Sequence, residues 1–214
     1  DPCWAVGEGC DTTDSPHAGW FTASNLPSLP LLSAPALKVV TGTLHVEKNN
    51  ALTKVQFDGV GHFARLSVEN NPILKFGYFD GLTSVGTPGE SEEESLVITD
   101  NIALEELGLG SLETVYGVLV VRDNALKSGL NLASLATAGT VEFSKNQSAH
   151  LDLSSLVTGE EPAKLYIESN PMLEHVSFNA SLGQTCWSTD FPNPAGVWGE
   201  MKANPLLPQC GVDI

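Results

Sequence analysis

The chain is poor in basic residues. Its 214 residues include 10 Lys and Arg against 26 Asp and Glu, so the formal net charge is −16 at pH 7. Such a surface repels phosphate groups, which excludes nucleic acid and anionic membranes as partners. Long apolar runs are also missing: none approaches the roughly 18 residues that a membrane-spanning helix needs. We therefore expect no membrane insertion, although a hydrophobic content of 42% is enough for a folded core.

Cysteine is scarce, and the few that occur lie near the two ends of the chain. There are four: Cys3, Cys10, Cys186 and Cys210. An even number placed in this way predicts disulfide bonds. Three connectivities are possible, and Cys3–Cys10 with Cys186–Cys210 is the simplest of them.

The cysteines indicate an oxidising compartment, and two further features agree. Asn146-Gln147-Ser148 and Asn179-Ala180-Ser181 are N-glycosylation sequons. The first residues, Asp1-Pro2-Cys3, include neither Met nor a signal-like segment, which suggests a processed start. We expect a secreted or cell-surface glycoprotein, modified at Asn146 and Asn179.

Signatures of catalysis and metal binding are absent as well. The five histidines show no metal-ligand spacing and do not cluster with the cysteines. No G-x-S-x-G nucleophile motif occurs. The glycine-rich stretch GVGHFA, residues 59–64, precedes an expected strand and not the helix that a dinucleotide site requires. We expect no enzyme activity, and no catalytic residue, metal or cofactor.

What the chain does have is a repeat marked by asparagine. The six positions are Asn49, Asn71, Asn101, Asn124, Asn146 and Asn170. Apolar residues recur five and three places before each asparagine, as Leu119 and Val121 precede Asn124. A leucine usually follows three places later, and a second apolar pair follows six and eight places later, as at Leu130 and Leu132, with Leu135 closing that unit. Each unit therefore predicts a strand, a turn, a second strand and a second turn.

One such unit of about 22 residues cannot bury an apolar face alone, so successive units must stack into a solenoid with parallel strand pairing. The asparagine side chains should then hydrogen-bond the backbone groups that the turn leaves unpaired, forming a ladder along the axis. Asparagine also tolerates left-handed backbone geometry, which we expect at these positions. The early apolar pair after Asn146, at Leu151 and Leu153, predicts a locally opened turn with the Asn146 side chain directed outward.

The unit L-x-Φ-x-x-N-x-x-L is similar to the core of the leucine-rich repeat. Its longer form, VTGTLHVEKNNAL at 40–52 and VYGVLVVRDNAL at 115–126, resembles the receptor L domain. The resemblance covers roughly residues 39–182. It implies a mainly β fold, a right-handed parallel β-helix of about six to eight coils with disulfide-bonded end caps. Members of that family bind hormones, build cell walls or act as adhesins.

This fold predicts three regions. Residues 1–38 form an N-terminal cap with a degenerate first coil, in which Asn25 is a ladder position. Residues 39–182 form the repeat solenoid, from which an acidic loop at 85–95 leaves the stack as a solvated bulge or, alternatively, a ligand or cation contact. Residues 183–214 form a C-terminal cap in which Met201 and Asn204 suggest one more coil. All four tryptophans lie in the two end regions, where a solenoid must be capped: Trp4, Trp20, Trp187 and Trp198.

A candidate ligand face follows from the positions two places before each asparagine. They point outward and include Glu47, Glu69, Arg122 and Glu168. Glu47 and Glu69 should lie on adjacent coils, about 5 Å apart. The pattern favours a non-enzymatic structural or adhesive protein that contacts a protein partner or copies of itself. The first alternative is an ectodomain that recognises a protein or glycan, and the second is a glycan-active enzyme that uses Glu47 and Glu69.

Overall fold

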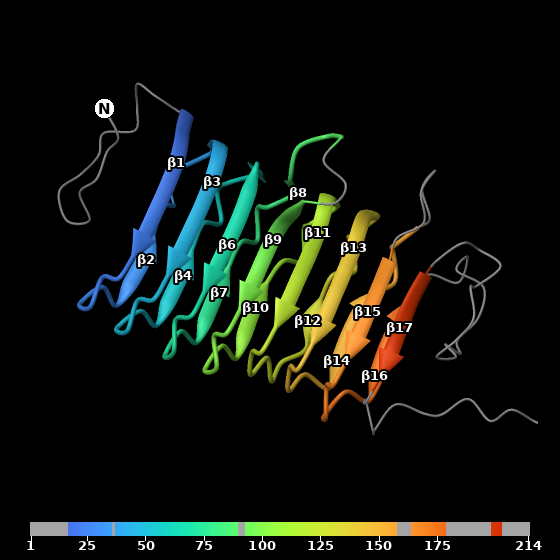
Figure 1. The fold of residues 1–214 in the computed structure, drawn as a ribbon. Coiled ribbons are helices and arrows are strands. Elements are labelled where there is room, and N and C mark those ends of the chain that lie inside the picture. The colour runs from blue at the N-terminus through green and yellow to red at the C-terminus, as the bar shows by residue number, and fades with distance from the viewer. Residues whose placement is uncertain (1–16, 36, 90–92, 158–163, 179–197, 203–214) are drawn as a thin grey trace, which may run out of the picture.

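The protein is a β-solenoid of about six turns in a computed structural model that describes residues 17–35, 37–89, 93–157, 164–178 and 198–202. Every regular element in these residues is a β-strand, and the strands pair in parallel in three sheets. Within the described residues, no helix is long and apolar enough to cross a membrane. Figure 1 shows the long strands lying side by side along the solenoid.

The largest sheet has ten strands, and its main path runs β1-β3-β6-β9-β11-β13-β15-β17, with β5 and β8 beside it. Its strands are β1 (His17–Ser24), β3 (Val39–Glu47), β5 (His62–Phe63), β6 (Arg65–Glu69), β8 (Ser84–Val85), β9 (Glu94–Thr99), β11 (Thr114–Arg122), β13 (Thr137–Ser144), β15 (Lys164–Glu168) and β17 (Trp198–Lys202).

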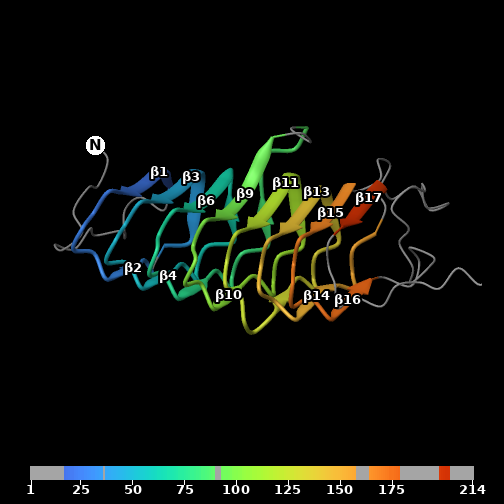
Figure 2. The same cartoon turned by 60° about the horizontal axis from the view of Figure 1, so that its bottom comes forward.

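The opposite side of the solenoid carries two shorter sheets, shown as the lower layer in Figure 2. The four-stranded sheet contains β2 (Leu31–Ser33), β4 (Lys54–Gln56), β7 (Phe76–Tyr78) and β10 (Glu106–Gly108). The three-stranded sheet contains β12 (Leu130–Asn131), β14 (His150–Leu153) and β16 (His175–Phe178). In the part of the chain that the structure describes, no strand pairing joins β10 to β12.

The core lies between these layers and is built from the apolar columns of the repeat. Strand register aligns Leu44, Leu66, Leu96, Leu119, Val141 and Leu165 in one column. A second column, two residues further on, includes Val46 and Val121. The predicted inward residues Leu119, Val121, Leu130, Leu132 and Leu135 are all buried. The predicted solenoid and its register are thus confirmed.

The two end regions of the chain are described only in part. β1 and β2 lie in the first of them and pair with β3 and β4, so a first coil is present. β17 continues the ten-stranded sheet beside β15, with Met201 opposite Ile167. The four cysteines, Trp4, Trp187, Asn179 and Asn204 lie outside the described residues, as do the predicted disulfide bonds.

Candidate functional site

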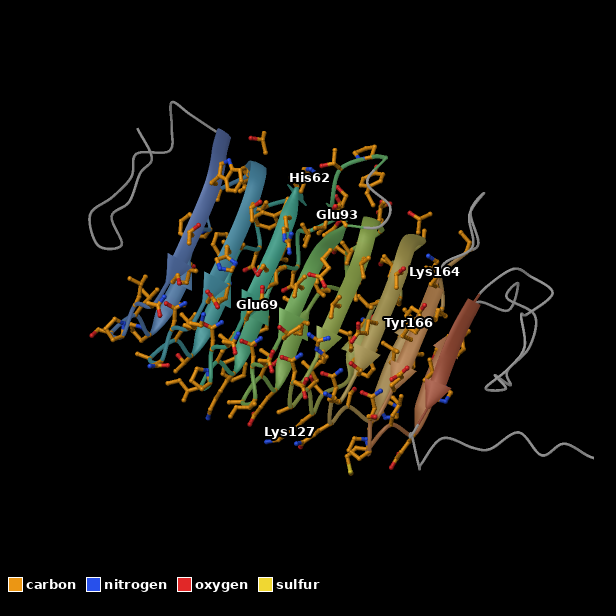
Figure 3. All side chains as sticks on the ribbon, in the orientation of Figure 1. His62, Glu69, Glu93, Lys127, Lys164 and Tyr166 are labelled. Carbon is orange, nitrogen blue, oxygen red and sulfur yellow. The ribbon has the colours of Figure 1, made fainter. Side chains whose placement is uncertain are left out.

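The four predicted ligand-face residues lie in one row across the ten-stranded sheet. Register places Glu47 opposite Glu69, Glu69 opposite Thr99, and Thr99 opposite Arg122. The row continues through Ser144 to Glu168. The repeat brings these residues together because they hold the same place in every coil. Figure 3 shows Glu69 and Tyr166 on this side of the ribbon.

A polar network surrounds the two neighbouring glutamates. His45 Nδ1 lies 3.0 Å from Ser67 Oγ, and the Ser67 hydroxyl donates to Glu69. The other ring nitrogen of His45 lies 3.5 Å from a carboxylate oxygen of Glu47. The Lys48 ammonium forms an ion pair with the Glu47 carboxylate. The hydrogen bond from Lys48 is the main reason that the pKa of Glu47 lies below its ordinary value. Glu47 and Glu69 thus each have a polar partner.

This network contains the residue types of a nucleophilic triad, but its geometry does not suit that chemistry. Ser67 is only 2% exposed. Its proton is directed to Glu69, so the His45 imidazole acts as a donor to Ser67 and not as the base that would activate it. The main-chain N–H groups of a paired parallel strand already donate to the neighbouring strands, so they are not free to stabilise an oxyanion. The arrangement is a hydrogen-bonded surface.

His45 and Ser67 hold outward places in the repeat but were not among the four candidate ligand residues. A signal for them exists in the sequence, since they are 22 residues apart and hold the same place in successive repeats. The contact between them depends on the side-chain rotamers, which the repeat does not specify.

A second network lies further along the face, around Arg122. Its guanidinium is 3.4 Å from Glu142 and 3.7 Å from Asp123. Ser144 Oγ donates to the same Glu142 oxygen at 2.9 Å, and Lys145 is 3.8 Å from Asp123. These side chains are part-exposed, so the ion pairs contribute little stability. They hold charges of both signs in defined places.

Between the two networks the outer face is apolar. Val97 and Val120 lie side by side and are 4% and 3% exposed. Tyr166 lies two strands further along the same row, beside Glu142, and is 39% exposed. The face therefore has two charged networks, separated by two valine side chains that are almost fully buried. Among the described residues, no group of three or more His, Cys, Asp or Glu side chains is placed to hold a metal ion.

The asparagine positions lie at the edge of this sheet, and all six side chains are buried. Each side-chain oxygen accepts a main-chain N–H from the coil before it, as when Asn124 Oδ1 accepts from Asn101 at 3.3 Å. Each Nδ2 donates to a carbonyl of an earlier coil, as from Asn124 to Ile98 at 2.9 Å. Asn124 Nδ2 also donates to the carbonyl of Arg122 at 2.9 Å. Consecutive coils are thereby joined through side-chain bonds at their turns.

The left-handed backbone geometry occurs one residue before the position that was predicted. Among the described residues, the non-glycine positions with positive φ are Asn25, Lys48, Asn70, Asp100, Asp123, Lys145 and Ser169. The ladder asparagines follow them with ordinary φ, because the sharp bend must come first to turn the next side chain inward. Asn25 belongs to the bend positions and not to the ladder, so its predicted role is corrected. In its coil, the N–H of Leu26 donates to Asn49 Oδ1 at 3.0 Å.

The predicted opening at Asn146 is also wrong. Asn146 is buried, and its Nδ2 donates to Val121 at 2.8 Å and to Ser144 at 3.0 Å. The shorter spacing to Leu151 is absorbed after the asparagine, where buried Ser148 donates to the carbonyl of His150 at 2.7 Å. A glycan needs this Nδ2 in solvent, so the folded structure contradicts modification at Asn146.

The acidic insertion is shorter than the predicted loop at 85–95. Val85 belongs to β8, and Glu94 and Ser95 belong to β9. Glu94 lies 3.5 Å from Arg65 on the outer face, and Ser95 is buried. Glu93, labelled in Figure 3, is exposed where this insertion returns to the sheet. Residues 90–92 lie outside the described part of the chain.

Comparisons with protein-family models, with curated proteins and with solved structures gave no match. The solenoid fold stands on the structure, whereas the specific likeness to the receptor L domain stays a prediction.

Proposed function

We propose that this chain is a non-enzymatic, extracellular structural or adhesive protein that assembles with copies of itself. The observation that carries the proposal is the pairing of the first and last strands of the ten-stranded sheet. Among the described strands of the main path, β1 pairs only with β3 and β17 only with β15. A strand edge that has no partner strand is a template for pairing with another chain. End-to-end addition would continue the parallel sheet of one copy into the next.

The register of the two end strands supports this arrangement. Trp20 pairs with Thr43, and Trp198 pairs with Lys164. Thr43 and Lys164 hold the same place in their repeats, so a tryptophan occupies one common row at each end of the sheet. The Trp20 side chain is 77% exposed. Stacking β17 of one copy on β1 of another would place the two tryptophan positions in the same row of the sheet, and aromatic pairs across strands are favourable.

The proposal is tested by light scattering and electron microscopy across a range of protein concentrations. Trp20→Lys places a charge on the β1 edge and should abolish end-to-end association. Ile102→Lys is the matched control, because Ile102 is also highly exposed but lies in a turn between β9 and β10. Monomers at every concentration in the unmodified protein would contradict self-assembly.

A second candidate function is recognition of a protein ligand by the ten-stranded face, as the proposed kinship with the receptor L domain suggests. The specific support is the exposed Tyr166 ring near the charged network of Arg122, since aromatic residues and arginine are enriched in protein interfaces. Under this reading the chain stays monomeric, and Tyr166→Ala or Arg122→Ala weakens partner capture. Capture that is unaffected by both substitutions would exclude the face.

A further inference from the structure

A groove lies on the side of the solenoid opposite the ten-stranded sheet. It has a volume of about 290 Å³ and lies where the four-stranded and three-stranded sheets fail to join, between β10 and β12. The cause is visible in the repeat, because Leu126 comes one place early and is still buried. The turn of this coil therefore falls after the leucine, at Lys127 and Ser128, and is followed by Gly129 at φ +87°.

Gly129 also allows a close approach of two coils at the groove. A Cβ atom at this position would lie 3.2 Å from the carbonyl oxygen of His150 and 3.3 Å from its Cβ. Glu106 of β10 and His150 of β14 line the groove together with this glycine. A side chain at Gly129 would crowd His150, so glycine lets this wall of the groove lie close to β14.

The walls of the groove combine hydrogen-bonding groups with apolar surface. The carboxylates of Glu106 and Asp152 are acceptors, and the Asn131 amide supplies donor hydrogens while its oxygen accepts the N–H of Ala133 at 2.9 Å. Leu107 and Leu130 add apolar atoms to the lining. Sugars need this combination, because their hydroxyls both donate and accept while their ring faces are apolar.

An aromatic surface adjoins the groove on β7. The rings of Phe76 and Tyr78 lie within 10° of parallel, with centroids 6.1 Å apart. The Tyr78 hydroxyl donates to Glu106 at 3.2 Å, which ties this surface to the groove wall. Aromatic rings offer large apolar area with little loss of conformational freedom on binding.

The charge of the groove lining selects among sugars. The described residues that line the groove include two carboxylates and neither lysine nor arginine. Burial and then the neighbouring Glu106 raise the pKa of Tyr78 above its ordinary value, with Asp80 and Asp58 adding to the effect. An acidic sugar would be repelled here.

We propose that this groove binds one ring of a non-acidic sugar, with its hydroxyl or amino groups held by Glu106, Asp152 and Asn131. The inference does not rest on self-assembly, since it concerns the opposite side of the solenoid and none of the groove residues lies on β1 or β17.

The experiment titrates the full chain with soluble oligosaccharides of neutral hexoses, N-acetylated and free amino sugars, and uronic acids, by calorimetry. The double variant Glu106→Gln, Asp152→Asn keeps the side-chain shapes and the oxygen at position 152 that accepts the Ser154 N–H, but it removes both charges. It should weaken binding by about tenfold or more, because hydrogen bonds to charged groups are the stronger ones. Ser128→Trp, which fills the groove, should abolish binding.

The matched control is Asp100→Asn, Glu113→Gln, which removes two exposed carboxylate charges outside the groove lining and should leave binding unchanged. Circular dichroism confirms that each variant is folded. Binding of no non-acidic sugar, preference for uronic acids, or equal loss in the control would each overturn the proposal. The Trp20→Lys variant should still bind the sugar. Sugar binding is thereby tested separately from self-assembly.

Discussion

At the scale of single residues, the asparagine and the residue before it have different roles in each turn. The asparagine supplies the bonds between coils, whereas the preceding residue adopts the strained backbone conformation. Seven such positions carry non-glycine residues, including Lys145 and Ser169. For most L-residues this conformation is unfavourable, so the bonds of the ladder must compensate for it.

Asn124→Ala should destabilise the protein by about 1–3 kcal/mol, because the substitution leaves buried groups of neighbouring coils unpaired. The groups affected are the carbonyl of Ile98 and the N–H of Asn101. Denaturant unfolding measures the change. Asn50→Ala is the control, since Asn50 is an exposed turn residue and should change stability little. Equal effects of the two substitutions would contradict the ladder.

Ser169→Gly should stabilise the protein by about 1 kcal/mol, because φ is 55° at Ser169 and glycine adopts this geometry without steric penalty. Ser154→Gly is the matched control, an exposed serine that is not among the positive-φ residues. There the loss of backbone restriction should reduce stability. Thermal and denaturant unfolding compare the two, and a loss of stability at both positions would refute the argument.

At the scale of elements, stability comes from the stacking of apolar columns between the sheets. The N-terminal half adds an aromatic cluster in which Phe57 contacts Phe79, with ring centroids 6.3 Å apart, and Phe21, at 5.7 Å. Each coil contributes one residue to each column, so a defect in one coil exposes its neighbours on both sides.

Leu119→Ala tests a central column, because Leu119 is fully buried between Leu96 and Val141. The cavity left behind should cost about 2–5 kcal/mol in the free energy of unfolding. Val118→Ala, one residue earlier on β11 and directed to the outer face, should cost less. An equal or greater cost at Val118 would show that the register of inward residues is incorrect.

At the scale of the whole molecule, the solenoid presents two unlike sides. The ten-stranded side carries ordered charges around an apolar centre, whereas the opposite side is interrupted by the groove between β10 and β12. The proposed contacts with other copies use the ends of the first side, and the proposed sugar site uses the second.

Modification at Asn146 should be absent from the folded protein. Its Nδ2 is buried and donates to Val121 and Ser144, so a glycan there requires the turn to open. Mass spectrometry of peptides after deglycosylation measures occupancy at Asn146 and Asn179 separately. Full occupancy at Asn146 in protein that keeps its native stability would refute the buried position.

The repeat by itself determined the solenoid, the buried columns and the alignment of Glu47, Glu69, Arg122 and Glu168 in one row. These follow from periodicity, because residues that hold the same place in successive coils must lie side by side. Only the tertiary structure decided that the bend precedes each asparagine, that Asn146 stays buried, and that a groove opens at Gly129. Those features depend on the backbone conformation of a coil whose spacing differs by one residue. Packing and hydrogen bonding against the neighbouring coils determine that conformation. The contacts that determine it join residues of different coils, far apart in the chain, so no local pattern of residues records the outcome.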